Sequence, residues 1–372
     1  MPSNLFQSWW LQNLLTLGLL AAIALIAWRL ARREYWRNAF HDICRNRLAV
    51  ISFLVLCGYG AIAVLDSIGW RRPLRNRETG ETARHPATGA VILDQGASAL
   101  DYLLAPISGK REKTYSAPLA ARDYTPTTVI SAAGQPQRLN APLTYPRSHL
   151  FGTDRVGLDV FCQACKSIRT GIIIGLLTTI LAVPFALVFG TAAGYYGGWI
   201  DDATQYVCTV LSSIPTVLFI AAFMIIFGQG LPQLALAMGI ASWTGLCRLL
   251  RGETIRLREA DFVQAARAMG VPSWRIIVRH VVPNVLHLVL ITTVIRFSGE
   301  VLAEAAFTYL GIGVGANTMS WGTMINDART ELTREPIIWW KLTAAFTFMV
   351  GLVLPANIFG DAVRDALDPR LH

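Results

Sequence analysis

The sequence predicts an all-α protein that crosses a membrane several times. Hydrophobic residues make up 53% of its 372 residues and charged residues only 15%, against about 25% charged in soluble proteins. The mean hydropathy is +0.43. Apolar residues gather in runs of about 20, the length that a helix needs to cross the hydrocarbon core. Basic residues cluster at the ends of these runs, so the net charge of +9 indicates membrane orientation rather than binding to nucleic acid.

The first domain, residues 1–68, contains two predicted spans. Trp9 to Trp28 is the first apolar run, and Leu48 to Ile68 is the second. The basic stretch between them, from Arg29 to Arg47, predicts a cytoplasmic loop and therefore an N-terminus outside the cell. No small-residue cleavage site follows the first run, which we therefore expect to remain as a membrane helix.

Residues 69–148 form a long region rich in polar residues, proline and glycine, and this topology places it outside the cell. Short apolar patches at 90–93 and 102–104 predict a small ordered cap, but no longer periodicity assigns its fold. Three roles stay open for this region. It could cover a pore, contact a partner protein or be a poorly ordered insert.

The third domain, residues 149–372, contains five more predicted spans. They are Ile172–Ala193, Tyr206–Phe227, Leu231–Leu250, Val285–Leu310 and Ile337–Phe359. Pro215 is expected to bend the second of these, and residues 195–202 to form a turn inside the cell. Residues 311–336 are expected to form an outer loop. Seven spans in all place the C-terminus in the cytoplasm.

A short polar segment, residues 258–284, separates two of these apolar runs. Its apolar residues repeat at i, i+3, i+4 and i+7, as on one face of a helix: Phe262, Ala265, Ala266 and Met269. A helix of about three turns is too short to span a bilayer. Gly270 suits a left-handed cap at its end, and Pro283 suits the first turn of the next helix. The two alanines predict a flat exposed face on which another protein can dock; an amphipathic loop resting on lipid headgroups is the alternative.

The order Gln264-Ala265-Ala266, then Gly270 and Pro283, resembles the EAA loop of ABC-importer permeases. In that family the loop is a cytoplasmic coupling helix that sits in a groove of the ATPase subunit. The resemblance implies a coupling loop over residues 251–284, with these residues at the ATPase: Glu259, Phe262, Gln264, Ala265, Ala266, Met269, Gly270 and Pro283. The chain departs from the family pattern, with Gln264 in place of Glu, His280 in place of Ile and Val282 in place of Leu.

Two other stretches, residues 149–160 and 360–371, resemble the oligopeptide, dipeptide and nickel permeases of the same family. Thr153 or Asp154 is expected to cap the helix that follows. Leu158 stands where the family usually has Arg, so any ion pair of that Arg is missing. The family core has six spans, which makes Trp9–Trp28 an extra one.

The resemblance implies a permease subunit of an ATP-driven, binding-protein-dependent importer in the bacterial inner membrane. The implied partners are a second permease subunit, identical or different, two cytoplasmic ATPase subunits and an extracytoplasmic solute-binding protein. The implied solutes are peptides or peptide-like molecules, and a nickel or metal-chelate importer is the alternative. A stand-alone secondary transporter is a hypothesis of another class, but such proteins often contain internal repeats and none is clear here.

Catalysis by this chain is not expected. A phosphate-binding GxxxxGK[ST] loop is missing from the sequence, so ATP and Mg²⁺ are expected on the partner ATPase subunits. The only close cysteine pair is Cys162 and Cys165, and a single CxxC is weak evidence for a metal or redox site. We therefore expect no cofactor and no metal in this chain.

Three charged residues fall inside one predicted span. Arg296, Glu300 and Glu304 are spaced i, i+4 and i+8, so they lie near one face of a helix, and an isolated charge at mid-membrane costs several kcal/mol. Arg296 and Glu300 could form a structural ion pair, or all three could line a translocation path. Glu304, nearer the outer surface, could instead contact a binding protein or a substrate gate.

Overall fold

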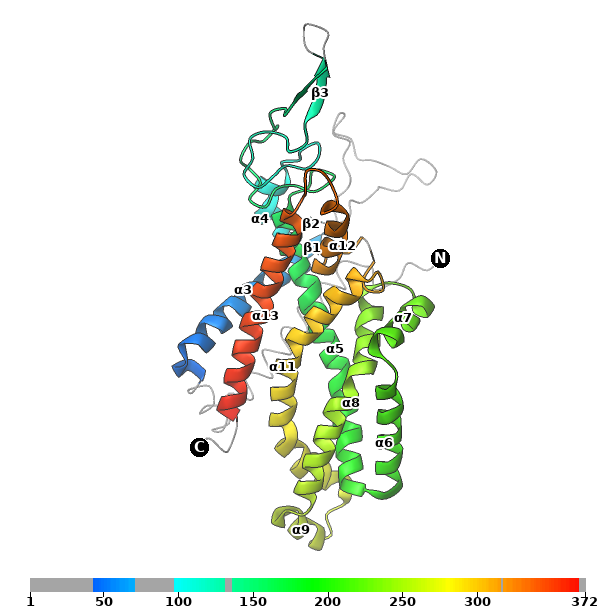
Figure 1. The fold of residues 1–372 in the computed structure, drawn as a ribbon. Helices are drawn as coiled ribbons and strands as arrows, with labels where there is room; N and C mark the ends of the chain where they lie inside the picture. The colour runs from blue at the N-terminus through cyan, green and yellow to red at the C-terminus, as the bar shows by residue number, and fades with distance from the viewer. Residues whose placement is uncertain (1–42, 71–96, 131–135, 316, 368–372) are drawn as a thin grey trace, which may run out of the picture. The chain divides into compact units, whose positions relative to one another are not determined.

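The computed structural model in Figure 1 describes residues 43–70, 97–130, 136–315 and 317–367. Within these residues, five helices are long and apolar enough to cross a membrane, and a bent pair of helices makes a sixth span if it is counted as one. The all-α polytopic fold is thereby confirmed. The spans are α3 (Arg47–Ser67), α5 (Val160–Tyr196), α6 (Gly198–Ser213) with α7 (Thr216–Phe227), α8 (Leu231–Arg258), α10 (Ser273–Ile276) continuing into α11 (Val282–Tyr309), and α13 (Trp340–Leu367). The predicted span Trp9–Trp28 lies outside the described residues.

The chain divides into two compact units, and the divisions among the described residues fall inside α3, α5, α12 (Trp321–Glu331) and α13. One unit takes its described residues from 57–169 and 328–348. The other takes them from 43–56, 170–327 and 349–367.

The first unit contains much of the region that lacks a predicted fold. Two antiparallel pairs of strands form there, β1 (Gly69–Trp70) with β2 (Ala97–Ser98) and β3 (Thr127–Ile130) with β4 (Pro136–Leu139). One helix, α4 (Ala99–Ser108), follows β2 directly. Its start is a capping box, in which the Ser98 hydroxyl accepts from the Asp101 backbone and the Asp101 carboxylate accepts from the Ser98 backbone.

The second unit contains a close approach of α5 to α8. A Cβ atom at Gly190 would lie 2.7 Å from the Cys247 carbonyl oxygen, and one at Gly194 would lie 2.6 Å from the Arg251 carbonyl oxygen. Two glycines four residues apart allow helix backbones to pack directly on each other in a membrane. The GxxxG spacing in the sequence therefore fixes this helix contact.

The predicted bend at Pro215 is confirmed, since the two helices on either side of it meet at a sharp angle. The axes of α6 and α7 differ by 87°, and Pro215, which cannot continue the hydrogen-bond ladder of α6, stands in the break. The predicted turn at residues 195–202 is wrong in its extent. α5 ends at Tyr196 and α6 begins at Gly198, so the turn shrinks to Gly197, which has a φ of 67°.

The predicted outer loop contains a helix, α12 (Trp321–Glu331). Trp321, Met324 and Ala328 are buried at i, i+3 and i+7, which is the period of an amphipathic helix. After α12, α13 begins at Trp340 and continues through Leu367. Most of the predicted cytoplasmic tail is therefore the last part of a long helix.

Candidate functional site

The polar segment between α8 and α11 contains a short helix, α9 (Asp261–Ala268), at one end of α8 (Figure 1). At eight residues it is shorter than the predicted three turns. Gly270 has a φ of 76°, and its backbone N–H donates to the Arg267 carbonyl while that of Val271 donates to the Ala266 carbonyl. These two bonds form a Schellman motif. The predicted left-handed cap at Gly270 is confirmed.

One face of α9 is packed into the core of the second unit. Val263 is 0% and Ala266 3% exposed, and both join a cluster of buried residues from α5, α8, α10 and the start of α11 that includes Tyr195, Leu250, Ile276 and Val285. Fully burying one Val side chain contributes roughly 1.5–3 kcal/mol. The expectation that Ala266 lies on the exposed face is therefore wrong.

The opposite face of α9 carries apolar side chains that the described residues leave uncovered. Phe262 is 43% and Met269 76% exposed, and Ala265 between them is also exposed. We call these three residues the exposed face of α9. A contiguous apolar face on an otherwise polar segment is typical of a protein interface.

Gln264, which replaces the Glu of the family pattern, lies beside this face. Its amide Nε2 donates to the Arg258 carbonyl at 3.2 Å and lies 3.4 Å from Glu259 Oε2. A carboxylate in this place could not donate either bond and would repel Glu259. Gln264 therefore connects α9 to the end of α8, and its amide can donate to the Glu259 carboxylate where a second carboxylate would repel it.

The chain leaves this segment through an irregular helix. Between α10 and α11 lies a π-helical stretch, η2 (Ile277–Val281), at whose end the backbone N–H of Val282 donates to the Ile277 carbonyl five residues earlier. Pro283 lies in the first turn of α11, as predicted, but the helix is continuous across it. Because proline offers no N–H and crowds the carbonyl four residues before it, the wider π turn accommodates it.

The charged row of α11 divides into two parts. Arg296 and Glu300 are 3.9 Å apart, and their side chains are 37% and 13% exposed. Glu304 is 0% exposed, and its Oε1 accepts a hydrogen bond of 2.9 Å from the Thr308 hydroxyl. That hydroxyl also accepts from the backbone of Val314, which follows α11. The prediction that Glu304 lines a path is therefore not met within the described residues, since the side chain has no open surface.

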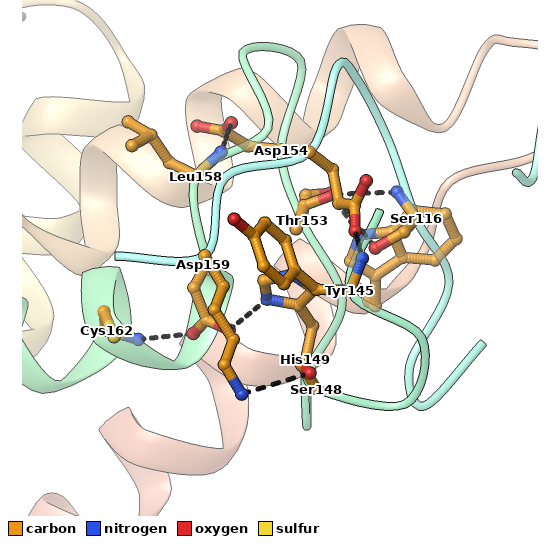
Figure 2. A network of polar contacts seen from close by, with 12 residues as sticks. Ser116, Tyr145, Ser148, His149, Thr153, Asp154, Leu158, Asp159 and Cys162 are labelled. Carbon is orange, nitrogen blue, oxygen red and sulfur yellow. Dashed lines mark hydrogen bonds and ion pairs between the residues drawn. The ribbon is translucent and has the colours of Figure 1, made fainter. Parts of the chain in front are cut away.

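A third polar group, in the first unit, organises the start of α5 (Figure 2). Asp159 is the residue before α5, and its Oδ1 accepts a 3.0 Å hydrogen bond from the Cys162 backbone, while Oδ2 lies 2.8 Å from His149 Nδ1. The predicted caps, Thr153 and Asp154, act elsewhere. Asp154 Oδ1 accepts from the backbone N–H groups of Val156 and Leu158 and so closes the turn before the helix.

Comparisons with known proteins show what this arrangement is similar to. Residues 186–372, which include α9 and α11, match the family described as binding-protein-dependent transport system inner membrane component. The chain is 34% identical over 336 residues to the dipeptide transport system permease protein DppC of Alkalihalophilus pseudofirmus, covering 90% of both chains. It is 31% identical over 257 residues to the oligopeptide transport system permease protein OppC of Bacillus subtilis, covering 69% of this chain and 80% of the relative. It is also 31% identical over 226 residues to the glutathione transport system permease protein GsiD of Pectobacterium atrosepticum, covering 60% and 73%.

Proposed function

Because the chain belongs to the family of binding-protein-dependent transport system inner membrane components, we propose that it conducts peptides as a permease of an ATP-driven importer. The observation that carries the solute class is the 34% identity to a dipeptide permease over 90% of both chains. As a multi-pass inner-membrane permease the chain is not itself an enzyme, and ATP is hydrolysed by a separate subunit.

The proposed assembly has two permease subunits, two cytoplasmic ATPase subunits and one extracytoplasmic binding protein. The exposed face of α9 is the proposed contact with an ATPase subunit. Support comes from its opposite face, where Val263 and Ala266 are buried against neighbouring helices of the same unit. A displacement of α9 must therefore move α8 and the start of α11 with it, because closely packed interiors transmit strain.

The proposed cycle follows from this linkage. ATP binding favours the state in which the two ATPase subunits are closed, so it favours the position of α9 that fits the closed pair. The spans attached to α9 then change from inward-facing to outward-facing. ATP hydrolysis and release of its products return the spans to the inward-facing state. One peptide delivered by the binding protein crosses in each cycle.

The proposed orientation places α9 in the cytoplasm and the N-terminus outside. Basic residues near α9 support it, since cytoplasmic ends of spans are enriched in Lys and Arg. They are Arg248, Arg251, Arg256, Arg258, Arg267, Arg275 and Arg279.

Uptake in a strain that lacks only this chain tests the proposal. We expect uptake of radiolabelled di- and tripeptides to be lost, to return with the gene, and to require ATP rather than a proton gradient. An affinity tag on the chain should recover an ATPase subunit from solubilised membranes. Unchanged peptide uptake together with lost nickel uptake would contradict the peptide assignment, and uptake that survives ATP depletion would indicate a stand-alone transporter.

A further inference from the structure

A small cavity lies between α5, α8 and α11 of the second unit. The residues that line it fall near the middle of each of these long helices, which corresponds to the middle of the membrane. Most of the cavity surface is apolar, but six of its lining residues carry polar groups: Thr179, Ser242, Thr292, Thr293, Arg296 and Glu300. A polar side chain at this depth is costly unless it has a polar partner.

The hydroxyl groups of this cavity lack such partners within the described part of the chain. Some threonine hydroxyls in the spans bond to their own helix, as Thr191 does to the Leu187 carbonyl at 2.6 Å and Thr204 does to the Ile200 carbonyl at 2.7 Å, whereas those of Thr178 and Thr254 have no partner within the described residues. None of the four hydroxyls lining the cavity makes a hydrogen bond to another described residue. Four hydroxyl-bearing residues from three helices therefore line one cavity, and their hydroxyl groups are available to a polar guest.

The ion pair in the cavity is loose. At 3.9 Å, the separation of Arg296 Nη2 and Glu300 Oε1 exceeds that of a hydrogen-bonded ion pair, which is about 2.7–2.9 Å. The Arg296 side chain is 37% exposed, so it has room to turn away, whereas that of Glu300 is only 13% exposed. Glu300 is therefore a fixed acceptor, and Arg296 is an exchangeable donor.

The size of the cavity limits what enters it. Its volume is about 20 Å³, and one water molecule needs roughly 10–15 Å³ measured in this way. An ammonium group is of similar size and donates three hydrogen bonds, for which the carboxylate and the hydroxyls supply acceptors. A carboxylate group is larger and would face Glu300 across a short distance.

We propose that this cavity is a mid-membrane subsite that receives the terminal ammonium group of a peptide in transit. The ammonium group replaces Arg296 as the partner of Glu300, and the released guanidinium pairs with the peptide's carboxylate. The net charge of the site is then balanced before, during and after passage, so no charge is left alone in the membrane. The identity of the guest rests on the proposed function, because a peptide is the solute that carries both groups.

Cysteine labelling of the complete importer in inner-membrane vesicles tests the subsite without using a peptide. In the variant Thr292→Cys, the labelling rate is measured with 2-aminoethyl methanethiosulfonate, which carries an ammonium group, and with uncharged methyl methanethiosulfonate. Both rates are taken during ATP turnover, by mass spectrometry of the fragment that contains position 292. Each is divided by the rate of the same reagent with a free thiol.

We expect the ammonium reagent to be favoured at least about fivefold, the effect of one opposite charge at about 4 Å in a watery site. Adding Glu300→Gln should bring the ratio to about one or below. Thr347→Cys on α13 is the matched control, since its hydroxyl is bonded within its own helix, and should show no preference.

Equal rates for the two reagents at position 292, no labelling there, or a preference that survives Glu300→Gln would overturn the subsite. Each of these results leaves peptide uptake by the unaltered importer unaffected. Loss of the proposed function would show instead as absent peptide uptake, so the two failures are distinguishable.

Discussion

The carboxylate of Asp159 joins His149 to the first turn of α5, with one oxygen 2.8 Å from His149 Nδ1 and the other accepting the Cys162 backbone N–H. Both side chains are almost completely buried. The contact fixes where α5 begins and ties that point to the segment preceding it (Figure 2). It is a structural anchor whose removal has a calculable cost.

Asp159→Ala should lower stability by about 2–4 kcal/mol, since it removes a helix cap worth about 1 kcal/mol and leaves a buried histidine nitrogen unpaired. Asp159→Asn should cost less, because its amide oxygen can still cap the helix. The measurement is the apparent melting temperature of the purified chain in detergent. Glu335→Ala, at an exposed carboxylate in the same unit, is the control. Equal melting temperatures for all variants would show that the contacts of Asp159 with His149 and Cys162 do not stabilise the chain.

Met269→Glu should abolish most peptide uptake. Its free energy of unfolding should stay within about 0.5 kcal/mol of that of the original protein, because the side chain is 76% exposed. ATP hydrolysis and uptake should separate in this variant. Val263→Glu should instead lower the amount of folded protein, since it buries a charge that costs several kcal/mol. Met319→Glu, an exposed methionine away from α9, is the matched control. Normal coupling in Met269→Glu would exclude this face as the ATPase contact.

Gly194→Ala should destabilise the second unit, because the new methyl group would lie 2.6 Å from the Arg251 carbonyl oxygen and 2.7 Å from Thr254 Cβ. We expect a loss of about 1–3 kcal/mol, as in other overpacked cores. Gly299→Ala is the control, since nothing lies within 4 Å of its added atom and alanine favours a helix. Retention of protein in membranes after mild heating measures both. A Gly194→Ala protein as heat-resistant as the control would mean that α5 and α8 can separate freely.

Glu300→Gln should slow peptide uptake at least about tenfold, equivalent to about 1.4 kcal/mol, with little change in the amount of folded protein. Glu304→Ala should instead lower the amount of folded protein more than it slows uptake per folded molecule, since it removes a buried partner of Thr308 and leaves a cavity. Uptake per molecule of folded permease, measured in vesicles, separates the two effects. Equal loss of both quantities in Glu300→Gln would assign the pair with Arg296 a structural role only.

Acid should weaken the attachment of α4. Burial alone raises the pKa of Asp101, but hydrogen bonds from Lys166 and Ser98 outweigh it and hold the pKa below its usual range. A carboxylate with a lowered pKa stabilises the folded state above its unfolded pKa of about 3.9, and this contribution is lost as the pH falls through the folded-state value. Hydrogen exchange of α4 should therefore accelerate below about pH 4, and less so in Asp101→Asn. If the exchange rate changes with pH only as that of an unstructured peptide does, the interaction of Asp101 with Lys166 does not stabilise α4.

Hydropathy and backbone chemistry made much of the fold predictable. A run of about 20 apolar residues has few alternatives in a membrane, because every backbone polar group must be satisfied within the helix. A glycine after the last turn of a helix is typical of a left-handed cap, because it lacks a Cβ atom that would clash at positive φ. The five long apolar helices of the described residues, and the cap at Gly270, follow from these local rules.

The parts that failed depend on contacts distant in the sequence. In α9, Phe262-Ala265-Met269 and Val263-Ala266 are both apolar faces, and only the surrounding helices decide that the second is buried. The helix propensity of the α12 sequence is ordinary, and the burial of its side chains depends on residues outside the helix. Glu304 shares a helical spacing with Glu300, but Thr308 and the chain after α11 enclose it.

The π-helical stretch Ile277–Val281 sets the angular position of everything beyond it. Each residue of an α-helix turns the chain by about 100°, so one residue more or fewer in this stretch swings Arg296 and Glu300 by that angle relative to α9. Deleting one residue there would rotate the charged pair away from Thr179 and Ser242, so the length of this irregular turn determines which side chains of α11 line the cavity with α5 and α8.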